Sequence, residues 1–255
     1  MIYAIRRPVM LALTGSLLAL PALHAEEKHH WTYSGQTGPG HWAALQSEYS
    51  VCGVGKTQSP IDIRDGVAKK SALAEIAFDY KPSPLEIIDN GHTIQVNYAP
   101  GSYITVDGKR CELVQFHFHK PSEETINGKS ADMVAHLVHK DTDGHLAVVA
   151  VLLKTGPSNK LVETLWKNLP HEKERETAVD GVQVNAAELL PAKTAAYYTF
   201  TGSLTTPPCS EDVTWFVLKT PTSISSAEVS RFAKLYPMNA RPTQPLNGRE
   251  IRTTP

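Results

Sequence analysis

Internal repeats, low-complexity tracts and Ser- or Gly-rich linkers are all lacking from this chain of 255 residues. Their absence excludes a repeat array and a string of flexibly joined modules. Once an N-terminal segment is set aside, a length of about 230 residues remains, which is routine for one large sheet-based domain. We therefore predict a single domain.

An excess of charge of one sign is also lacking. Lys and Arg number 25 against 26 Asp and Glu, which gives a net charge of -1. Residues 1–25 contain two Arg and no acid, so without them the basic count falls from 25 to 23 and the net charge becomes -3. This balance favours neither nucleic acid nor an anionic membrane surface. We predict no partner of either kind.

Long apolar runs are lacking except at the N-terminus. Arg6 and Arg7 precede an apolar stretch from Val9 to Leu20, and Ala25 offers a small residue for cleavage. This pattern is typical of a secretory signal peptide. No other run approaches the roughly 18 to 20 residues that a membrane helix needs. We predict a signal peptide at residues 1–25 and a mature domain at residues 26–255, either released after export or held by an uncleaved signal anchor.

Cysteine is scarce, with three residues in the chain. Cys52 and Cys209 lie in loops rich in Gly or Pro, whereas Cys111 begins a predicted strand. Disulfides persist in exported proteins, and two loops can move to meet more easily than a strand can. We therefore predict a disulfide between Cys52 and Cys209, with Cys111 free as a small buried residue. Closing a loop of about 157 residues would stabilise the fold by about 4 to 5 kcal/mol on the chain-entropy account.

Strand patterns outnumber helical ones. Short segments punctuated by Gly, Pro and Asn predict strands at 76–80, 85–89, 93–98, 103–107, 112–120, 132–139, 146–153 and 213–219. Helices are predicted from Lys160 to Asn168, and from a capping box at Ser225 to the residue before Pro237. The short spacing between strands argues against repeated βαβ units. We predict a mainly β (α+β) fold, with a largely antiparallel sheet and peripheral helices.

A His-x-His pair is the main chemical signal. Successive side chains on a strand alternate faces, so His117 and His119 share one face with Gln115, while Phe116 and Phe118 pack on the other. Two imidazoles about 7 Å apart can converge on one ion. Most histidines bind no metal, however, and this chain has 11.

A third histidine favours the metal site over a chance pair. His136 follows His119 by 17 residues, and Asn127-Gly128 between them is a strong turn signal. A hairpin with a loop of roughly ten residues would set His136 beside the first two. Three nitrogen ligands with one open position are typical of catalytic rather than structural zinc.

Many further motifs accompany these histidines, and together they closely resemble the α-class carbonic anhydrases. The resemblance runs from about residue 28 to 252. It implies a twisted, mostly antiparallel sheet of about ten strands, reversible CO2 hydration, a Zn²⁺ cofactor and a bacterial periplasmic type. The segments that carry it are 29–33, 38–42, 58–63, 90–92, 115–119, 121–123, 136–139, 202–209 and 241–247.

The resemblance implies a mechanism for this sequence. His117, His119 and His136 would hold Zn²⁺, and zinc-bound hydroxide would attack CO2. Carbonic anhydrase is itself the reference case for a metal that lowers the pKa of bound water to about 7. Thr205 would accept the hydroxide's hydrogen bond and donate onward to Glu123. His92 would shuttle the proton to buffer, since its unperturbed pKa of about 6.5 suits that transfer.

Further residues take roles from the same resemblance. Gln115 and the Asn239 backbone would hold His117 and His119 from behind. The family's pocket for CO2, itself apolar, corresponds to Val138, Val148, Leu204, Val213 and Trp215. The polar residues that order the water network correspond to Tyr33, Asn90, Gln95 and Thr206.

This chain departs from the family behind His136. The family places a Glu two residues before that histidine, where this chain has Val134. It also places a His where this chain has Glu124 and a Tyr where it has Phe200. We predict that Glu124 supplies the missing carboxylate, within about 3.5 Å of the His136 ring. The alternative is that Glu124 points to solvent and His136 bonds water or a carbonyl.

Other function classes remain open. A catalytically silent carbonic-anhydrase-like binding module is one, although such relatives usually lack a zinc histidine. A periplasmic zinc buffer is another, suggested by His24, His29 and His30 near the mature start. The resemblance further implies binding of sulfonamide inhibitors and allows a homodimer.

Overall fold

The computed structural model describes Met1 and residues 30–255. Apart from Met1, the predicted signal peptide lies outside the described residues. Within residues 30–255, no helix is long and apolar enough to cross a membrane.

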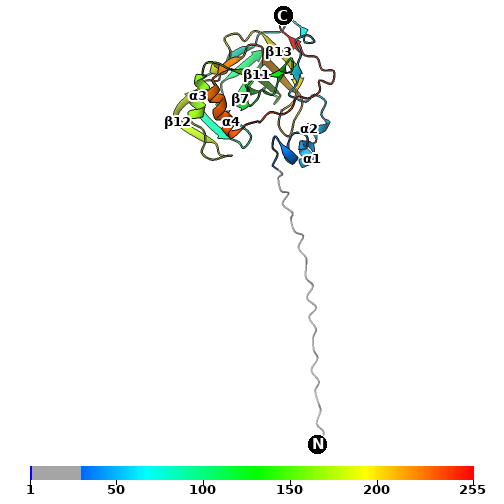
Figure 1. Ribbon diagram of the computed structural model, residues 1–255, viewed down its shortest axis with the longest axis vertical. Helices are drawn as coiled ribbons and strands as arrows, with labels where there is room; N and C mark the ends of the chain where they lie inside the picture. The colour runs from blue at the N-terminus through cyan, green and yellow to red at the C-terminus, as the bar shows by residue number, and fades with distance from the viewer. Residues whose placement is uncertain (2–29) are drawn as a thin grey trace.

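A mixed sheet of 13 strands dominates the described part of the chain (Figure 1). Its main path contains ten strands, as predicted for the family fold. Their order is β12 (Thr177–Val184), β4 (Ser83–Asp89), β5 (Ile94–Asn97), β7 (Lys109–His119), β10 (Met133–Lys140), β11 (Leu146–Thr155), β14 (Val213–Leu218), β13 (Tyr197–Gly202), β16 (Arg252–Thr253) and β2 (Lys69–Lys70). The three strands off this path are β3 (Ala77–Asp79), β6 (Tyr103–Val106) and β15 (Thr222–Ile224).

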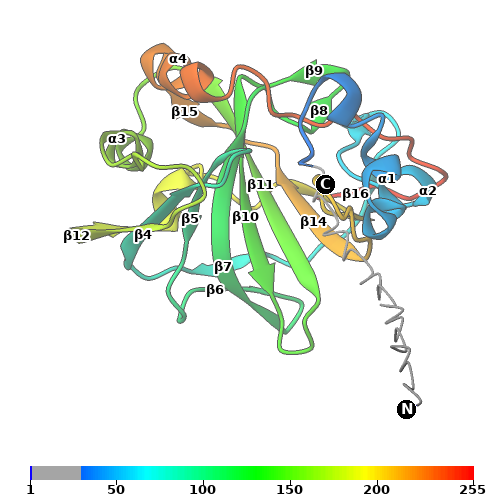
Figure 2. The ribbon, with the colours of Figure 1, turned by 90° about the horizontal axis from the view of Figure 1, so that it is seen from below.

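Most neighbours in this sheet are antiparallel. The parallel pairs among the described strands of the large sheet are β11 with β14, β11 with β15, and β16 with β2. A separate sheet of three short strands comprises β1 (Asp62–Ile63), β8 (Thr125–Ile126) and β9 (Lys129–Ser130). The long strands β7, β10 and β11 run side by side through the middle of the molecule (Figure 2).

The central strands separate two apolar cores. On β10, seven consecutive residues from Met133 to His139 are buried, so both faces of the strand are covered. Leu137 belongs to the larger core, together with Phe116 and Phe118 of β7. Val134 and Val138, which alternate with Leu137, belong to the smaller core. The smaller core therefore shares its sheet face with His136, two residues from each valine.

Two helices cover one end of the larger core, α3 (Lys160–Lys167) and α4 (Ser226–Leu235). The Asn159 side chain caps α3, and Ser225 forms the predicted capping box with Glu228 on α4. Trp166 of α3 stacks on Phe232 of α4, with ring centroids 5.6 Å apart.

The short helical segments lie elsewhere. Helices α1 (Trp42–Leu45) and α2 (Val51–Val54) lie on the opposite side of the molecule from α3 and α4 (Figure 2). The 3-10 turns are η1 (Gly35–Thr37), η2 (Ser47–Tyr49) and η3 (Ala186–Leu189).

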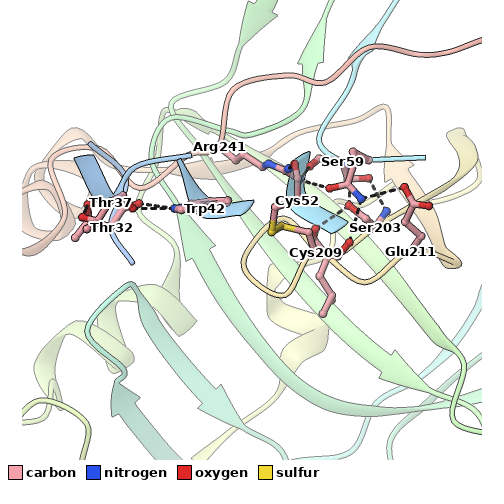
Figure 3. The surroundings of a disulfide bond; sticks show 11 residues. Thr32, Thr37, Trp42, Cys52, Ser59, Ser203, Cys209, Glu211 and Arg241 are labelled. Atoms are coloured by element: carbon pink, nitrogen blue, oxygen red, sulfur yellow. Dashed lines mark hydrogen bonds between the residues drawn. A yellow bond between two sulfur atoms is a disulfide. The ribbon is translucent and has the colours of Figure 1, made fainter. Parts of the chain in front are cut away.

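The predicted disulfide is present. Cys52 of α2 is bonded to Cys209, while Cys111 of β7 is free, and it is only half-buried rather than buried as expected. The bond ties α2 to the loop that follows β13 (Figure 3). Each of the eight predicted strands and both predicted helices overlaps an observed element. The sequence patterns did not predict β12, β13, α1, α2 or the strands of two or three residues other than β3.

Candidate functional site

Three imidazole rings meet on the face of the smaller core. His117 and His119 lie on β7, and the antiparallel register sets His136 of β10 directly opposite His117. One ligand nitrogen from each of the three lies within 4.8 Å of the others, so together they could hold a metal ion. The strand pairing predicted from the sequence is therefore confirmed.

The connection between these strands is more ordered than predicted. Instead of a plain loop of about ten residues, it contains β8 and β9, which form a small hairpin of their own. Asn127 and Gly128 make its turn at positive φ, 53° and 76°. Those angles are the ones that favour Asn-Gly in a tight hairpin.

Each imidazole is held from behind by an acceptor. His117 Nδ1 donates to Gln115 Oε1 at 2.8 Å, and His119 Nδ1 donates to the Asn239 carbonyl at 2.7 Å. His136 uses its other nitrogen, since its Nε2 donates to Glu124 Oε2 at 3.1 Å. The nitrogens left to face one another are His117 Nε2, His119 Nε2 and His136 Nδ1.

This donor set fits a zinc ion. His119 Nε2 is buried with no hydrogen-bond partner among the described residues, although a buried polar atom is normally satisfied. Three nitrogens whose tautomers are fixed by acceptors on the far side of each ring are the usual ligand arrangement of catalytic zinc.

Burial also controls the charge of these rings. It lowers the pKa of His117 to about 3, and the neighbouring His136 lowers it further in the same direction. Burial likewise holds the pKa of His119 well below its usual value. For His136, burial acts to lower the pKa, but the hydrogen-bonded Glu124 carboxylate and the Glu123 charge raise it overall.

A second carboxylate faces the free nitrogens. Glu123 Oε2 lies 3.5 Å from His119 Nε2 and 3.8 Å from His136 Nδ1, and it has no hydrogen-bond partner among the described residues. The Arg241 backbone N–H donates to Glu123 Oε1 at 2.7 Å. Burial raises the pKa of Glu123 to about 7, and a hydrogen bond with the Thr205 side chain opposes that rise.

An apolar wall adjoins the imidazoles. Val138, Val148 and Trp215 lie in one row across β10, β11 and β14, because each is paired with the next in register. Val213 belongs to the same cluster, and Leu204 packs against it. The Trp215 and His136 ring centroids are 4.9 Å apart. The five residues predicted to line a pocket therefore lie together beside the histidines.

Comparison with known proteins agrees with this geometry. A family profile described as eukaryotic-type carbonic anhydrase matches residues 37–255. The chain belongs to the α-class carbonic anhydrase family. A carbonic anhydrase of Klebsiella pneumoniae is 44% identical over 225 residues, which cover 87% of this chain and 90% of that protein.

Solved structures of the family superimpose closely. A hyperthermostable carbonic anhydrase from a hydrothermal vent chimney is 48% identical, with a TM-score of 0.84 over 89% of this chain and 100% of that one. The α-carbonic anhydrase of Thermovibrio ammonificans, solved in complex with the inhibitor sulfanilamide, is 43% identical. Its TM-score is 0.84, over 88% of this chain and 98% of that one.

His92, the residue predicted to be the proton shuttle, lies in an aromatic stack. The His92 ring is parallel to Trp31, with centroids 3.5 Å apart, and also to His30 at 4.8 Å. Burial lowers the pKa of His92 to about 4, and the charges of His30 and Lys173 lower it in the same direction. Sequence reasoning did not assign Trp31 or His30 to the site. The signal for both is the run His29-His30-Trp31, which indicates the family and, through its two histidines, a zinc buffer.

The polar residues predicted near His92 hold its loop and the next strand. Asn90 Oδ1 accepts from the backbone N–H of His92 at 3.0 Å, and Asn90 Nδ2 donates to Gln95 Oε1 at 3.3 Å. Gln95 of β5 lies opposite His117. Tyr33 packs edge-on against Trp31, and its hydroxyl is buried without a partner among the described residues.

The loop of residues 203–210 carries Thr205 and Thr206 and is anchored at both ends. Ser203 and Ser59 exchange two hydrogen bonds, at 2.8 and 3.1 Å (Figure 3). Arg241 Nη2 donates to the Cys52 carbonyl at 3.0 Å, beside the disulfide. Sequence reasoning gave Ser59 and Arg241 no individual role, because their partners lie more than 100 residues away.

Proposed function

We propose that this chain catalyses the reversible hydration of CO2 to bicarbonate at a Zn²⁺ ion held by His117, His119 and His136. The observation that carries the proposal is the convergence of three imidazole nitrogens, each with its other nitrogen held by an acceptor. A bound zinc ion supplies a Lewis acid that lowers the pKa of water at its open position, an effect for which carbonic anhydrase is the reference case.

Thr205 and Glu123 would orient the oxygen nucleophile. The Thr205 side chain acts to lower the pKa of Glu123, and in the proposed arrangement its hydroxyl donates to that carboxylate, which leaves the Thr205 oxygen as an acceptor. An acceptor there takes a hydrogen bond from a protonated oxygen and fixes the direction of its lone pair. The Arg241 N–H holds Glu123 in this position from the other side.

The apolar row would receive CO2. CO2 has no hydrogen to donate and carries no net charge, so an apolar surface suits it better than a polar one. Val138, Val148 and Trp215 supply that surface beside His136, and Leu204 and Val213 extend it.

His92 would take the proton that hydration releases. In its stack the ring is half-buried and its pKa falls to about 4, below the value of about 6.5 expected from the sequence. The lowered pKa favours release of a proton to buffer but disfavours the uptake that precedes it. Asn90 and Gln95 join the His92 loop to the strand opposite His117, a suitable path for water between the two histidines. Tyr33 and Thr206 are proposed to order the same waters.

The setting is part of the proposal. The predicted signal peptide at residues 1–25 would deliver a domain of residues 26–255 to the periplasm, where the Cys52–Cys209 disulfide is stable. Sulfonamides are proposed as inhibitors, because the Thermovibrio relative was solved with sulfanilamide. A homodimer is also part of the proposal, and sedimentation velocity tests it through the mass of the protein in solution.

Stopped-flow CO2 hydration tests the function. We expect fast hydration that is lost on zinc chelation, restored by zinc and blocked by a sulfonamide. His119→Ala should lose both bound zinc and hydration, whereas His171→Ala, an exposed histidine outside the sheet, should keep both. Hydration no faster than buffer from a folded, zinc-loaded protein would favour the silent binding module, and exchangeable zinc without hydration would favour a zinc buffer.

A further inference from the structure

The strand that carries His136 has no polar group of its own to hold that ring. Val134 lies two residues earlier on the same face, where a side chain could reach the back of the imidazole. Its side chain is fully buried and packs in the apolar cluster with Phe200 and Trp215. The partner of His136 Nε2 must therefore come from another segment.

That partner is Glu124, from the connection between β7 and β10. Its Oε2 accepts the His136 Nε2–H at 3.1 Å, and the whole side chain is excluded from solvent. Its other oxygen, Oε1, is buried without a hydrogen-bond partner among the described residues. Among the described residues, His136 is therefore the one hydrogen-bond partner of the Glu124 carboxylate. This buried polar group depends on a single ring for its hydrogen bonding.

The backbone around Glu124 is fixed on both sides. The Ser122 hydroxyl donates to the Glu124 carbonyl at 2.8 Å, and it accepts the Ala131 N–H at 2.8 Å. Thr125 pairs with Asp62 in the small parallel strand pair and donates to its carboxylate at 2.6 Å. Glu124 is therefore held between two anchors rather than on a free loop.

Phe200, which packs in the same apolar cluster as Val134, offers no polar atom to His136. Phe200 of β13 is buried and parallel to Trp215, with centroids 6.2 Å apart. Trp215 in turn contacts His136. Among these neighbours, His136 therefore has an aromatic ring, Trp215, and one carboxylate, Glu124, as its contacts.

We propose that Glu124 is the positioning residue for His136: it fixes the ring so that Nδ1 faces the metal, and it replaces a carboxylate that Val134 cannot supply. This inference rests on the proposed zinc site. A carboxylate behind a ligating imidazole fixes its tautomer and strengthens its donation, and losing such a partner typically weakens metal binding or activity 10- to 100-fold.

The test is the zinc dissociation rate, measured by transfer of zinc to a chromophoric chelator, together with the visible spectrum of the Co²⁺-substituted protein. Glu124→Ala should release zinc about 10- to 100-fold faster and change the Co²⁺ bands. Glu124→Gln keeps an acceptor of the same shape and should fall between wild type and Glu124→Ala. Glu228→Gln, a buried acid in the remote capping box of α4, should leave both readouts unchanged.

A rescue variant separates positioning from general damage. In Glu124→Ala/Val134→Glu, a carboxylate returns from the strand itself, and zinc release should slow to within about threefold of wild type. If that double variant does not fold, Glu124→Gln and Glu124→Ala alone decide the question. Folded Glu124 variants with the wild-type release rate and Co²⁺ spectrum would overturn the inference. A wild-type protein that binds no zinc would instead overturn the proposed function.

Discussion

The Thr205 side chain interacts with the buried Glu123 carboxylate and acts to lower its pKa, and its proposed role is to orient the nucleophile. We predict that Thr205→Ala lowers kcat/KM for CO2 hydration by about 100-fold, because the nucleophile loses the acceptor that orients it. Thr205→Ser should retain most of the activity. Stopped-flow measurements check this, with Thr201→Ala, an exposed threonine of β13, as the matched control. Equal activity of the alanine and serine variants would contradict the assigned role.

The three histidines of the site also show which of its features could be predicted from individual residues of the sequence. Alternation along one strand predicted that His117 and His119 share a face, and the turn signal predicted the pairing with His136. Of their hydrogen-bond acceptors, Gln115 follows the same alternation, whereas Glu124 and Asn239 obey no such local rule. Glu124 was predicted only because Val134 departs from the family, and the Asn239 carbonyl was predicted only from the resemblance itself.

At the scale of elements, the segment after α3 bears on the proposed shuttle. The backbone of Lys173 forms an isolated parallel β-bridge with that of Asp89, which ends β4 and lies three residues before His92. Burial is the main reason that the pKa of His92 is low, with His30 and Lys173 acting in the same direction.

We predict that Lys173→Gln raises the pKa of His92 above about 4, because one nearby positive charge is removed. NMR titration of the His92 Cε1–H checks this, and the acid limb of the kcat–pH profile should move to higher pH with it. Lys167→Gln, on the exposed face of α3, is the control. An unchanged His92 titration in Lys173→Gln would refute the coupling.

The loop of residues 203–210 depends on the disulfide and on Arg241. We predict that Cys52→Ser/Cys209→Ser lowers the free energy of unfolding by about 4 to 5 kcal/mol on the chain-entropy account, since the bond closes a 157-residue separation. Urea unfolding measures the change. Cys111→Ser, which breaks no bond, should cost far less, and equal losses in the two proteins would reject the prediction.

Elements with a local signal were predictable, and the rest depend on distant partners. The long strands and both capped helices follow from apolar patterning and turn residues. Strand β12 escaped prediction because a register shift against β4, with Gly181 at positive φ, interrupts its pattern. The two-residue β2 exists only because Arg252 and Thr253, more than 180 residues later, pair with it.

On the scale of the whole molecule, acid stability depends on buried neutral histidines. His139 is fully buried, with Nε2 2.8 Å from the Tyr80 hydroxyl, and burial lowers its pKa to about 3. Between pH 6.5 and 3, the unfolded chain therefore binds a proton at His139 that the folded chain does not bind. The stability linked to this residue is complete above pH 6.5 and falls as the pH drops toward 3.

We predict that His139→Gln makes unfolding less sensitive to acid, because an amide does not titrate. Between pH 7 and pH 4.5 the variant should lose about 2 to 3 kcal/mol less stability than wild type. Urea unfolding at the two pH values measures the difference. The exposed Thr201→Ala, which removes no titrating group, should show the wild-type dependence, and a His139→Gln protein that does the same would contradict the assignment.

The hydrogen bonds of the metal centre have a consequence for how the chain is made. His119 takes its acceptor from Asn239, 120 residues later, and Glu123 takes a donor from Arg241. A ribosome that has synthesised β7 and β10 has therefore produced all three histidines but not the groups that fix His119 and Glu123. The site can be completed only after nearly the whole chain has emerged, so we expect that a metal held there is captured at the end of folding rather than at its start.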